Sequence, residues 1–409
     1  MNCRFCNAKL TYIFADLGKS PLANSYLKID EINRMECFYP LRVYVCSECF
    51  LVQLEEFESP KKIFTKYVYL SSYSQTWLKH VEDYVDEVTE RFGLKEGSQI
   101  IEIASNDGYL LQFFQKKGCS ILGIEPAENV AKIALEKKIP TESKFFGSKT
   151  AKELVASKGR ADLLIAFNVL PHVPDLIDFV SGLKILLKKN GIITIQFSAY
   201  LLQLLNQNEF DTIYHEHFSY FSLYCLQQIF SHHGLTVFDV EELPIHGGSM
   251  RLYIKNSEDS SIEISDNVGH KVKEEKKNGL QNISTYTGFQ EKIKIKKQNI
   301  WKFFIDANTD HKTIVGYGAP AKGNTLLNYC GIGNDFVEYT VDINPLKQGL
   351  YLPGTHIPIY NPDKIFETKP DYVLILAWNL KDEIMEQMRA IGDWGGKFVV
   401  LIPEVKVFS

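Results

Sequence analysis

The sequence predicts an α/β protein in which a small, metal-stabilised N-terminal domain precedes two Rossmann-like domains. Two Cys-x-x-Cys pairs open the chain, and two series of short apolar runs, each alternating with helical patterns, follow them. A chain of 409 residues with 45% hydrophobic content is long enough to form two or three domains with their own cores. We therefore predict domains over residues 1–65, 66–297 and 298–409.

The N-terminal segment carries the residue types of a metal site. Cys3 and Cys6 form the first pair, Cys46 and Cys49 form the second, and 39 residues separate the two pairs. Four thiolates on two tight turns satisfy a tetrahedral Zn²⁺, and a closed four-sulfur shell leaves no position for water or substrate, so such a zinc is structural. The alternating residues 41–53 predict a strand at the second pair, as in a zinc ribbon. A redox dithiol or two disulfides are the alternative interpretations.

Composition argues against several classes of protein. The net charge of −5 gives no overall basic field to hold nucleic acid or an anionic membrane. The chain opens without the pattern of a signal peptide, and no apolar run approaches the ~20 residues of a membrane span. We expect a soluble, cytoplasmic protein whose remaining cysteines are small buried hydrophobic side chains. These cysteines are Cys37, Cys119, Cys225 and Cys330.

The apolar runs are spaced as the strands of two mainly parallel sheets. In the second domain they are residues 99–104, 120–125, 162–167 and 191–196. In the third domain they begin at residues 313, 337, 372 and 397. Between the two series, a stretch of mixed charges from about residue 256 to 297 predicts a solvent-exposed helix that bridges the domains.

A candidate cofactor loop follows the first strand of the second domain. Residues 102–114 pass from that strand to a helix through small and polar side chains, a turn that holds a ligand against the backbone. The loop has one glycine, Gly108, and lacks Gly-x-Gly-x-x-Gly, so it does not favour a pyrophosphate. Glu125, about 20 residues further on, is placed to accept both ribose hydroxyls. The acidic surroundings favour S-adenosylmethionine over NAD, but an NAD-dependent oxidoreductase and a plain surface carboxylate at Glu125 stay open.

The densest polar cluster of the chain lies in residues 211–222. Within seven residues it holds two histidines, a carboxylate and two phenols, namely Tyr214, His215, Glu216, His217 and Tyr220. A histidine near its ordinary pKa can act as a base with a carboxylate orienting its ring, and phenols can donate to an enolate oxygen. His172 follows another strand at the same sheet edge and would face the same crevice. A metal site at His-x-His or a purely structural loop are the alternatives.

Three other segments suggest substrate contacts. Residues 246–251 combine flexible glycines with a guanidinium that suits phosphate or carboxylate. Residues 315–325 form a glycine turn that leads into a helix, where backbone N–H groups and a lysine attract phosphate. Tyrosines cluster just ahead of the second domain, although ring packing and ordinary turns are alternatives here. The expected substrate-binding residues are Tyr67, Tyr69, Tyr73, His246, Arg251, Tyr317, Ala319, Lys322 and Asn324.

In order and over essentially the full length, these motifs resemble those of the sugar C-methyltransferases. That family uses S-adenosylmethionine to methylate a ring carbon of nucleotide-linked keto-deoxysugars. The resemblance implies a three-domain monomer with a zinc-binding domain, a class I methyltransferase core and a Rossmann-like C-terminal domain that helps to hold the nucleotide sugar. It also implies His217 as the base, with Tyr214 and Glu216 beside it and His172 nearby. The matching segments are the cysteine pairs and residues 102–111, 123–131, 214–217, 246–251 and 316–324.

One departure from the family pattern is Ala104, where glycine is expected. The resemblance implies S-adenosylmethionine and structural Zn²⁺ as cofactors, and a keto sugar carried by dTDP or GDP as substrate. Deprotonation of a 4-keto sugar at C3 would give an enolate that attacks the methyl group in line. Methylation at C5, at oxygen or at nitrogen, and a non-enzymatic zinc-containing binding protein, are the alternatives. The expected cofactor-binding residues are Glu102, Ala104, Ser105, Asn106, Gly108, Tyr109, Glu125, Pro126 and Asn168.

Overall fold

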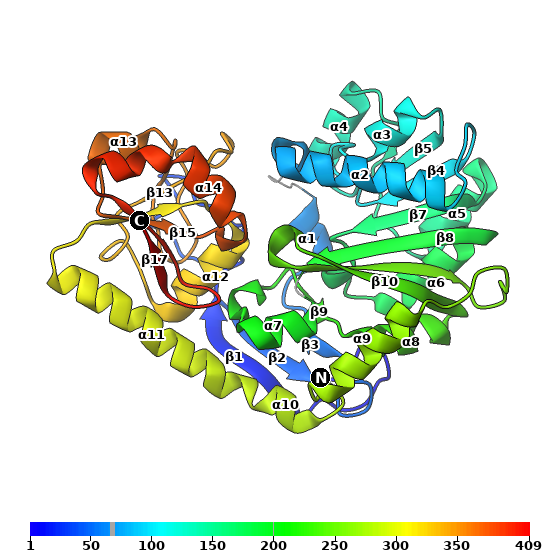
Figure 1. Cartoon of the computed structure of the whole chain (residues 1–409), viewed down its shortest axis with the longest axis horizontal. Helices are drawn as coiled ribbons and strands as arrows, with labels where there is room; N and C mark the ends of the chain where they lie inside the picture. The colour runs from blue at the N-terminus through cyan, green and yellow to red at the C-terminus, as the bar shows by residue number, and fades with distance from the viewer. Residues whose placement is uncertain (66–69, 199) are drawn as a thin grey trace.

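A computed structural model of the chain describes residues 1–65, 70–198 and 200–409, which form three sheets (Figure 1). Each sheet defines one lobe: the N-terminal lobe (1–65), the central lobe (70–256) and the C-terminal lobe (310–409). Tyr67 and Tyr69, two of the expected substrate-binding residues, lie outside the described residues. Across the described chain, every helix is too short or too polar to cross a membrane.

The N-terminal lobe is built on an antiparallel sheet of order β1-β2-β3-β9. Its strands are β1 (Tyr12–Ser20), β2 (Tyr39–Val45), β3 (Val52–Leu54) and β9 (Ser219–Tyr220), and helix α1 (Pro60–Phe64) follows. β2 and β3 confirm the predicted strand structure around the second cysteine pair. β9 belongs to the central lobe in sequence, yet it pairs with β3 through Val52 and Tyr220. The N-terminal sheet is therefore attached directly to the polar cluster that precedes β9.

The central lobe holds a seven-stranded sheet of order β10-β11-β8-β7-β4-β5-β6. All four predicted strands are present, as β4 (Gln99–Ile103), β5 (Ser120–Ile124), β7 (Ala161–Phe167) and β8 (Leu187–Ser198). They run parallel and are mostly buried, because helices cover both faces of the sheet. The sequence did not indicate β6 (Thr141–Glu142) or the antiparallel hairpin of β10 (Leu235–Leu243) and β11 (Ser249–Asn256).

Among the described residues of the central lobe, seven α-helices accompany this sheet. They are α2 (Gln75–Arg91), α3 (Leu111–Lys116), α4 (Glu128–Glu136), α5 (Ser148–Lys158), α6 (Leu176–Leu186), α7 (Leu201–Gln207) and α8 (Leu223–His232). α2 buries Trp77, Val81 and Tyr84, spaced at helical intervals, and exposes its charged face. These contacts bring the start of α2 to the cofactor end of the sheet.

The charged stretch does form the predicted helical bridge between the lobes (Figure 1). It consists of α9 (Asp266–Lys277), α10 (Ile283–Thr287) and α11 (Phe289–Thr309). α11 buries an apolar stripe that includes Ile293, Ile300 and Phe304, and Phe289 stacks on Phe14 of β1 at 4.8 Å between ring centroids. The expected domain boundary at residue 298 falls inside α11, which passes without a break from one lobe to the other.

One acidic residue of this stretch is not solvated as expected. Glu275 of α9 is fully buried, where it accepts hydrogen bonds from the Tyr200 hydroxyl at 2.6 Å and from the backbone N–H groups of Leu223 and Tyr224 at 2.6 and 2.9 Å. Burial raises the pKa of this carboxyl. Glu275 therefore fixes the bridge to the first turn of α8.

The C-terminal lobe is a second small Rossmann-like unit of order β14-β13-β12-β15-β16-β17. Its strands are β12 (Ile314–Tyr317), β13 (Thr340–Val341), β14 (Ile359–Tyr360), β15 (Tyr372–Ile375), β16 (Lys397–Val400) and β17 (Lys406–Phe408). Only β17 is antiparallel to its neighbour. Its helices are α12 (Ala321–Cys330), α13 (Lys364–Thr368) and α14 (Lys381–Gln387). The four predicted strands of this domain are confirmed.

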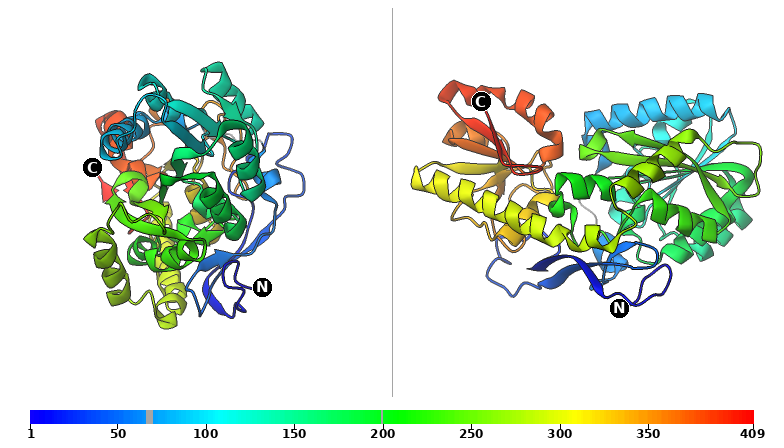
Figure 2. Two further views of the ribbon diagram at one scale, coloured as in Figure 1. Left: turned by 90° about the vertical axis from the view of Figure 1, so that its right-hand side faces the viewer. Right: turned by 60° about the horizontal axis from the view of Figure 1, so that its bottom comes forward.

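The N-terminal strands lie beneath the junction of the two larger lobes, as the right-hand view of Figure 2 shows. Loops from all three lobes consequently meet near residues 211–217. Of the cysteines outside the two pairs, Cys119, Cys225 and Cys330 are buried as expected. Cys37 is exposed, because the segment that carries it loops away from the N-terminal sheet, so its expected burial is wrong.

Candidate active site

The loop after β4 adopts the backbone conformation that a ligand-cradling turn requires. Ala104, Asn106 and Gly108 all have positive φ, of 54°, 49° and 78°. A Cβ atom at Gly108 would lie 2.8 Å from Ile139 Cγ1, so both backbone conformation and space require glycine there. Ala104 adopts the left-handed conformation that glycine favours, which explains physically why the family pattern has glycine at this position. The alanine costs roughly 1 kcal/mol of backbone strain.

Glu125, at the end of β5, faces this loop. Its two carboxylate oxygens accept hydrogen bonds from the backbone N–H groups of Asn106 at 2.9 Å and Ala127 at 2.8 Å. Burial raises the pKa of the Glu125 carboxyl to about 7, although the two backbone N–H groups oppose that shift. The carboxylate is thus held firmly at the end of the strand, where a nucleoside ribose is bound in this class of fold.

A cavity of about 330 Å³ opens between this loop, Glu125 and the end of β7. Aromatic side chains form much of its wall, including Trp77, Phe146 and Phe167, as expected of a site for an adenosine ring. The volume and lining fit the adenosyl part of S-adenosylmethionine. Six expected cofactor-binding residues line the cavity, namely Ala104, Asn106, Tyr109, Glu125, Pro126 and Asn168.

The other three expected residues lie under the loop rather than on the cavity wall. Ser105 is fully buried, and Gly108 shapes the turn. Glu102 is also fully buried, and its burial raises its pKa well above the usual carboxyl value. Asp107 is paired with Lys137 Nζ at 2.8 Å. The acidic surroundings inferred from sequence are therefore largely neutralised, and Glu125 is the member of this group that lines the cavity.

Replacing Glu125 with glutamine is expected to weaken S-adenosylmethionine binding about 10- to 100-fold, since hydrogen bonds to a charged group contribute about 1.5–3 kcal/mol. Wild-type affinity should also fall as the pH is lowered through about 7, because protonation removes the carboxylate acceptor. Titration calorimetry across pH measures both effects. Glu128→Gln, at the exposed start of α4, is the matched control. A Glu125→Gln protein with wild-type affinity and pH dependence would contradict this assignment.

The polar cluster of residues 211–217 forms a loop between α7 and β9, with the 3₁₀ turn Phe210–Thr212 at its start. His217 is 4% exposed. Its Nδ1 lies 2.9 Å from the carbonyl oxygen of Thr212, and its Nε2 lies 2.8 Å from the Tyr214 hydroxyl. A carbonyl only accepts, so Nδ1 carries the proton and Nε2 accepts from Tyr214. Nε2 is therefore the basic atom of this pair.

His172 joins this loop to the cofactor cavity. It belongs to the 3₁₀ turn Leu170–His172 after β7, lines the cavity, and has its ring centroid 4.8 Å from that of His217. Its Nδ1 donates to the carbonyl oxygen of Glu216 at 2.7 Å, so the proton of the neutral ring is on Nδ1 and Nε2 carries the lone pair. Burial lowers the pKa of His172 to about 4. Burial also lowers the pKa of His217 well below its usual value, and the neighbouring His172 and Lys322 lower it further.

Glu216 is the buried carboxyl of the loop. It is 2% exposed, and Asn24 Nδ2 donates to its two oxygens at 2.8 and 3.0 Å. Burial raises the pKa of Glu216 to about 7, while the amide of Asn24 lowers it. His215 is directed instead toward the N-terminal lobe, where its Nε2 contacts the Pro40 carbonyl at 3.2 Å. The His-x-His pair therefore does not converge as a metal site.

The C-terminal lobe contacts the same loop from the other side. Trp378 Nε1 donates to Asp211 Oδ2 at 2.7 Å, and the Lys322 ammonium lies 4.7 Å from the centre of the Trp378 ring. Asp211 is fully buried and its burial raises its pKa, whereas the charge of Lys322 lowers it. Lys322 is the expected phosphate-binding residue, and it sits at this junction of two lobes.

The other expected substrate-binding residues are placed in different ways. Tyr317 ends β12 in the C-terminal lobe, and Ala319 follows this strand, where its backbone N–H donates to Asp342 at 2.8 Å. Asn324 is buried in α12, and Tyr73 is 48% exposed near the start of α2. The side chain of His246 is not described, but Gly247 of the same turn lies so close to Trp378 that a Cβ atom would approach the ring to 2.8 Å. This glycine turn therefore packs against the C-terminal lobe.

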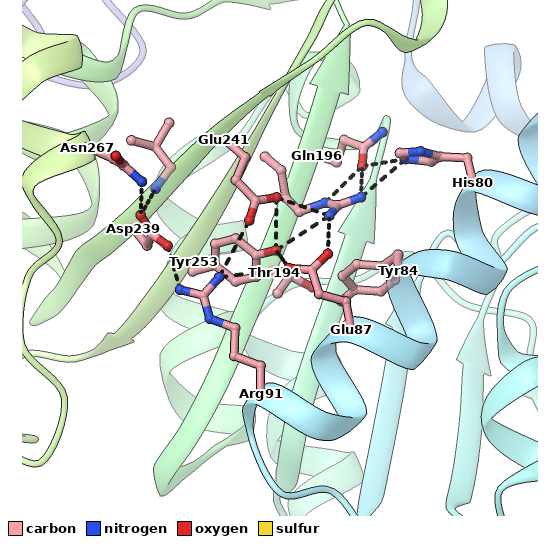
Figure 3. Close-up of polar contacts among 12 residues, drawn as sticks. His80, Tyr84, Glu87, Arg91, Thr194, Gln196, Asp239, Glu241, Tyr253 and Asn267 are labelled. Atoms are coloured by element: carbon pink, nitrogen blue, oxygen red, sulfur yellow. Dashed lines mark hydrogen bonds and ion pairs between the residues drawn. The ribbon is translucent and has the colours of Figure 1, made fainter.

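Arg251, an expected substrate-binding residue, is buried in the central lobe and is not among the residues that line the cofactor cavity. It is 2% exposed on β11, and its guanidinium bonds to Gln196 at 3.0 and 3.1 Å and to Glu241 at 3.2 Å. Figure 3 labels these two partners and the residues around them. The guanidinium also lies 4.6 Å from the centre of the Tyr84 ring. Side chains alternate between the two faces of a strand, and the side chain of Arg251 lies on the face of β11 that packs against α2. Arg251 is thus a structural cation that fixes α2 to the sheet.

Replacing Arg251 with methionine is expected to lower the free energy of unfolding by about 2–4 kcal/mol, because the buried Gln196 oxygen loses two donors and Glu241 loses one of its two arginine partners. Urea denaturation followed by circular dichroism measures this. Arg389→Met, at an arginine whose side chain is 80% exposed, should change stability by no more than about 0.5 kcal/mol. Equal stabilities of the two variants would refute the structural role.

The four cysteines of the N-terminal lobe form a metal-binding group. Their sulfur atoms all lie within 4.8 Å of one another, with Cys3 and Cys49 at 3.6 Å and Cys6 and Cys46 at 3.4 Å. A tetrahedral Zn²⁺ with bonds of about 2.3 Å places its sulfurs about 3.8 Å apart, whereas a disulfide brings them to about 2.05 Å. The group therefore fits zinc and not disulfides. Gln53 Nε2 lies 3.2 Å from Cys3 Sγ and orients that ligand.

Several residues of the site carried no local signal in the sequence. Asn24 and Trp378 act on partners 192 and 167 residues away, so no spacing rule could associate them. Asp211 stands at the edge of the polar cluster, but its role follows only from its contact with Trp378. Asp175 and Asp178 line the cofactor cavity, and no motif of the sequence marks them.

Comparison with known proteins agrees with this arrangement. Three family models match consecutive parts of the chain: a zinc binding domain over residues 3–64, a methyltransferase domain over 77–240, and a C-methyltransferase C-terminal domain over 244–403. The C-methyltransferase NovU of Streptomyces niveus is 35% identical over 407 residues, which cover 100% of this chain and 96% of the relative.

Solved methyltransferases resemble part of the chain at low identity. Magnesium protoporphyrin IX methyltransferase (ChlM) from Synechocystis PCC 6803 with bound SAM is 14% identical and has a TM-score of 0.37, over 50% of this chain and 100% of that one. The plantazolicin methyltransferase BpumL in complex with SAH is 13% identical, with a TM-score of 0.34, over 43% and 82%. The full-length relative and the three family models together show that the chain belongs to the C-methyltransferase family, as an S-adenosylmethionine-dependent enzyme with a zinc-binding N-terminal domain.

Proposed function

We propose that the enzyme methylates C3 of a nucleotide-linked 4-keto-deoxysugar in the cytoplasm, in the biosynthesis of a branched deoxysugar, and that it does so as a monomer. The observation that supports this most strongly is the pair of adjacent, neutral imidazoles beside the cofactor cavity. A sugar carbon becomes nucleophilic only when a neighbouring ketone acidifies its C–H bond and a base removes the proton. S-Adenosylmethionine, when bound, supplies an electrophilic methyl group to that carbon.

His217 and Tyr214 would remove the proton. Nε2 of His217 holds a lone pair toward the Tyr214 hydroxyl, so a proton taken from the sugar carbon can end on this nitrogen, either directly or through the phenol. Because burial keeps the pKa of His217 well below its usual value, the imidazole is in its basic form at neutral pH. Nδ1 keeps its proton throughout, and the hydrogen bond that it donates to the Thr212 carbonyl oxygen holds the ring in place.

Lys322 connects substrate binding to this base. The positive charge of Lys322 disfavours the imidazolium that His217 must form. A nucleotide diphosphate, either dTDP or GDP, bound at Lys322 would neutralise that charge and raise the basicity of His217 when substrate is in place. Tyr317, Ala319 and Asn324, in the glycine turn and the first helix of the C-terminal lobe, would help to hold the nucleotide.

The experiment that tests this function is methyl transfer from S-adenosylmethionine carrying a ¹³C-labelled methyl group to a panel of dTDP- and GDP-linked 4-keto-deoxysugars. The expected product has its labelled methyl on C3, seen by NMR as a methyl coupled to a ring carbon that has lost its hydrogen. A methoxy or N-methyl product, or turnover of a sugar without a ketone, would overturn the proposal.

A further inference from the structure

We infer that Asn24, in the N-terminal lobe, is a positioning residue for the catalytic loop and acts through Glu216. Both hydrogen bonds that the structure gives to the Glu216 carboxylate come from Asn24 Nδ2, at 2.8 and 3.0 Å. Asn24 lies in the long loop between β1 and β2, and Glu216 lies 192 residues further along the chain. The inference concerns the family's methyl transfer and extends the roles proposed above for residues 214–217.

Asn24 is itself held in a fixed orientation. The Tyr26 hydroxyl lies 3.2 Å from Asn24 Oδ1 and donates to the Ala319 carbonyl oxygen at 2.6 Å. Lys347 Nζ donates to the same carbonyl at 2.9 Å and lies over the Tyr26 ring at 5.5 Å. Because an ionised carboxylate only accepts hydrogen bonds, the amide must direct its Nδ2 group at Glu216, and this leaves Oδ1 beside the Tyr26 hydroxyl. The segment that contains Asn24 is thus wedged between the catalytic loop and the C-terminal lobe.

The position of Glu216 sets the geometry of the imidazoles. The Glu216 backbone carbonyl accepts the Nδ1 proton of His172 at 2.7 Å, and the next residue is His217. If the Glu216 side chain lost its anchor, the carbonyl that fixes the His172 tautomer would move with it. A shift of about 1 Å in such a site can cost roughly 10²-fold in rate. Asn24 therefore affects catalysis although it touches neither histidine in the structure.

The amide also determines which form of Glu216 is stabilised. Asn24 donates two hydrogen bonds, and these favour the ionised carboxylate against the desolvation that opposes it. The titratable groups that face Glu216 are the Tyr26 phenol and, through its backbone carbonyl, His172; Lys347 lies behind the Tyr26 ring. Removing the amide leaves a buried carboxylate without its donor. The pKa of Glu216 would therefore rise, and the carboxyl would stay protonated up to a higher pH.

Two substitutions test the inference. Asn24→Leu removes the donor at nearly constant volume and should lower kcat about 10- to 100-fold, with unchanged S-adenosylmethionine affinity by calorimetry. Asn24→Asp places two carboxyls together, which share one proton at low pH and both ionise at high pH. Its activity should therefore fall reversibly as the pH rises, whereas that of the wild type does not. Asn33→Ala, at an exposed asparagine of the same lobe, is the control and should match the wild type.

A third measurement does not depend on the substrate. Infrared difference spectroscopy, with Glu216→Gln used to assign the band, should place the protonation midpoint of Glu216 at higher pH in Asn24→Leu than in the wild type. An unmoved midpoint, or wild-type kcat in Asn24→Leu, would overturn the inference. A wild-type enzyme that fails to turn over any keto sugar would instead count against the proposed substrate, so the two failures are distinguishable.

Discussion

His217→Asn should lower kcat by about 10²- to 10⁴-fold, the usual contribution of a general base, while S-adenosylmethionine affinity stays within twofold of the wild type. Asparagine can still donate to the Thr212 carbonyl and so preserves the loop, but its amide has no basic lone pair to replace Nε2. His217 is 4% exposed and is not among the residues that line the cofactor cavity, so cofactor binding should be spared. Steady-state kinetics and calorimetry on the same preparation measure both quantities.

His232→Asn is the matched control, because His232 is exposed at the end of α8, away from the loop. It should retain wild-type kcat. The pH profile gives a second check: because burial holds the pKa of His217 well below its usual value, wild-type activity should not decline near pH 6.5 through protonation of this residue. Full activity of His217→Asn would show that His217 is not the catalytic base.

Removing zinc, or replacing Cys46 with serine, should unfold the N-terminal lobe and abolish turnover. The lobe is a small sheet whose two cysteine turns are held together at one group of sulfur atoms, and structural zinc contributes on the order of 10 kcal/mol to such folds. Loss of this lobe would release both β9, which pairs with β3, and Asn24 from the catalytic loop. Zinc content, limited proteolysis and near-ultraviolet circular dichroism follow the unfolding directly.

The control is Cys37→Ser, because Cys37 is exposed and lies outside the metal-binding group. It should keep both zinc and activity. S-Adenosylmethionine binding to the zinc-free protein is expected to survive in part, since the cofactor cavity is lined almost entirely by the central lobe. A soluble, fully active and zinc-free Cys46→Ser enzyme would show that the metal has neither a structural nor a positioning role.

The parts of this site that the sequence predicts are those governed by local rules. The spacing of the cysteine pairs indicates a four-sulfur group, and the strand-loop-helix pattern places Glu125 at the carboxyl end of β5 opposite the cofactor loop. The family pattern also singles out Ala104, and its positive φ explains why. In each case a few consecutive residues determine the geometry, so the sequence contains the information needed.

The parts that sequence does not predict depend on long-range packing. The role of Arg251 depends on which face of β11 it occupies, and that face is set by pairing with β8 and β10, strands whose antiparallel register has no marker in the chain. Nothing in the sequence around Asn24 or Trp378 indicates a role in the site. Their roles arise because folding brings Asn24 to Glu216 and Trp378 to Asp211. The polar cluster is thus recognisable from its composition, whereas the groups that hold it in place are not.

The central claim is that a neutral histidine removes a proton from a carbon beside a ketone. The most direct test is to incubate the enzyme with a nucleotide-linked 4-keto-deoxysugar in D₂O without any methyl donor and to follow the C3 hydrogen by NMR. Enzyme-dependent exchange of deuterium at C3 is expected in the wild type, and its loss is expected in His217→Asn. Absence of exchange at C3 in folded wild-type enzyme that still transfers methyl groups to that sugar would contradict this claim.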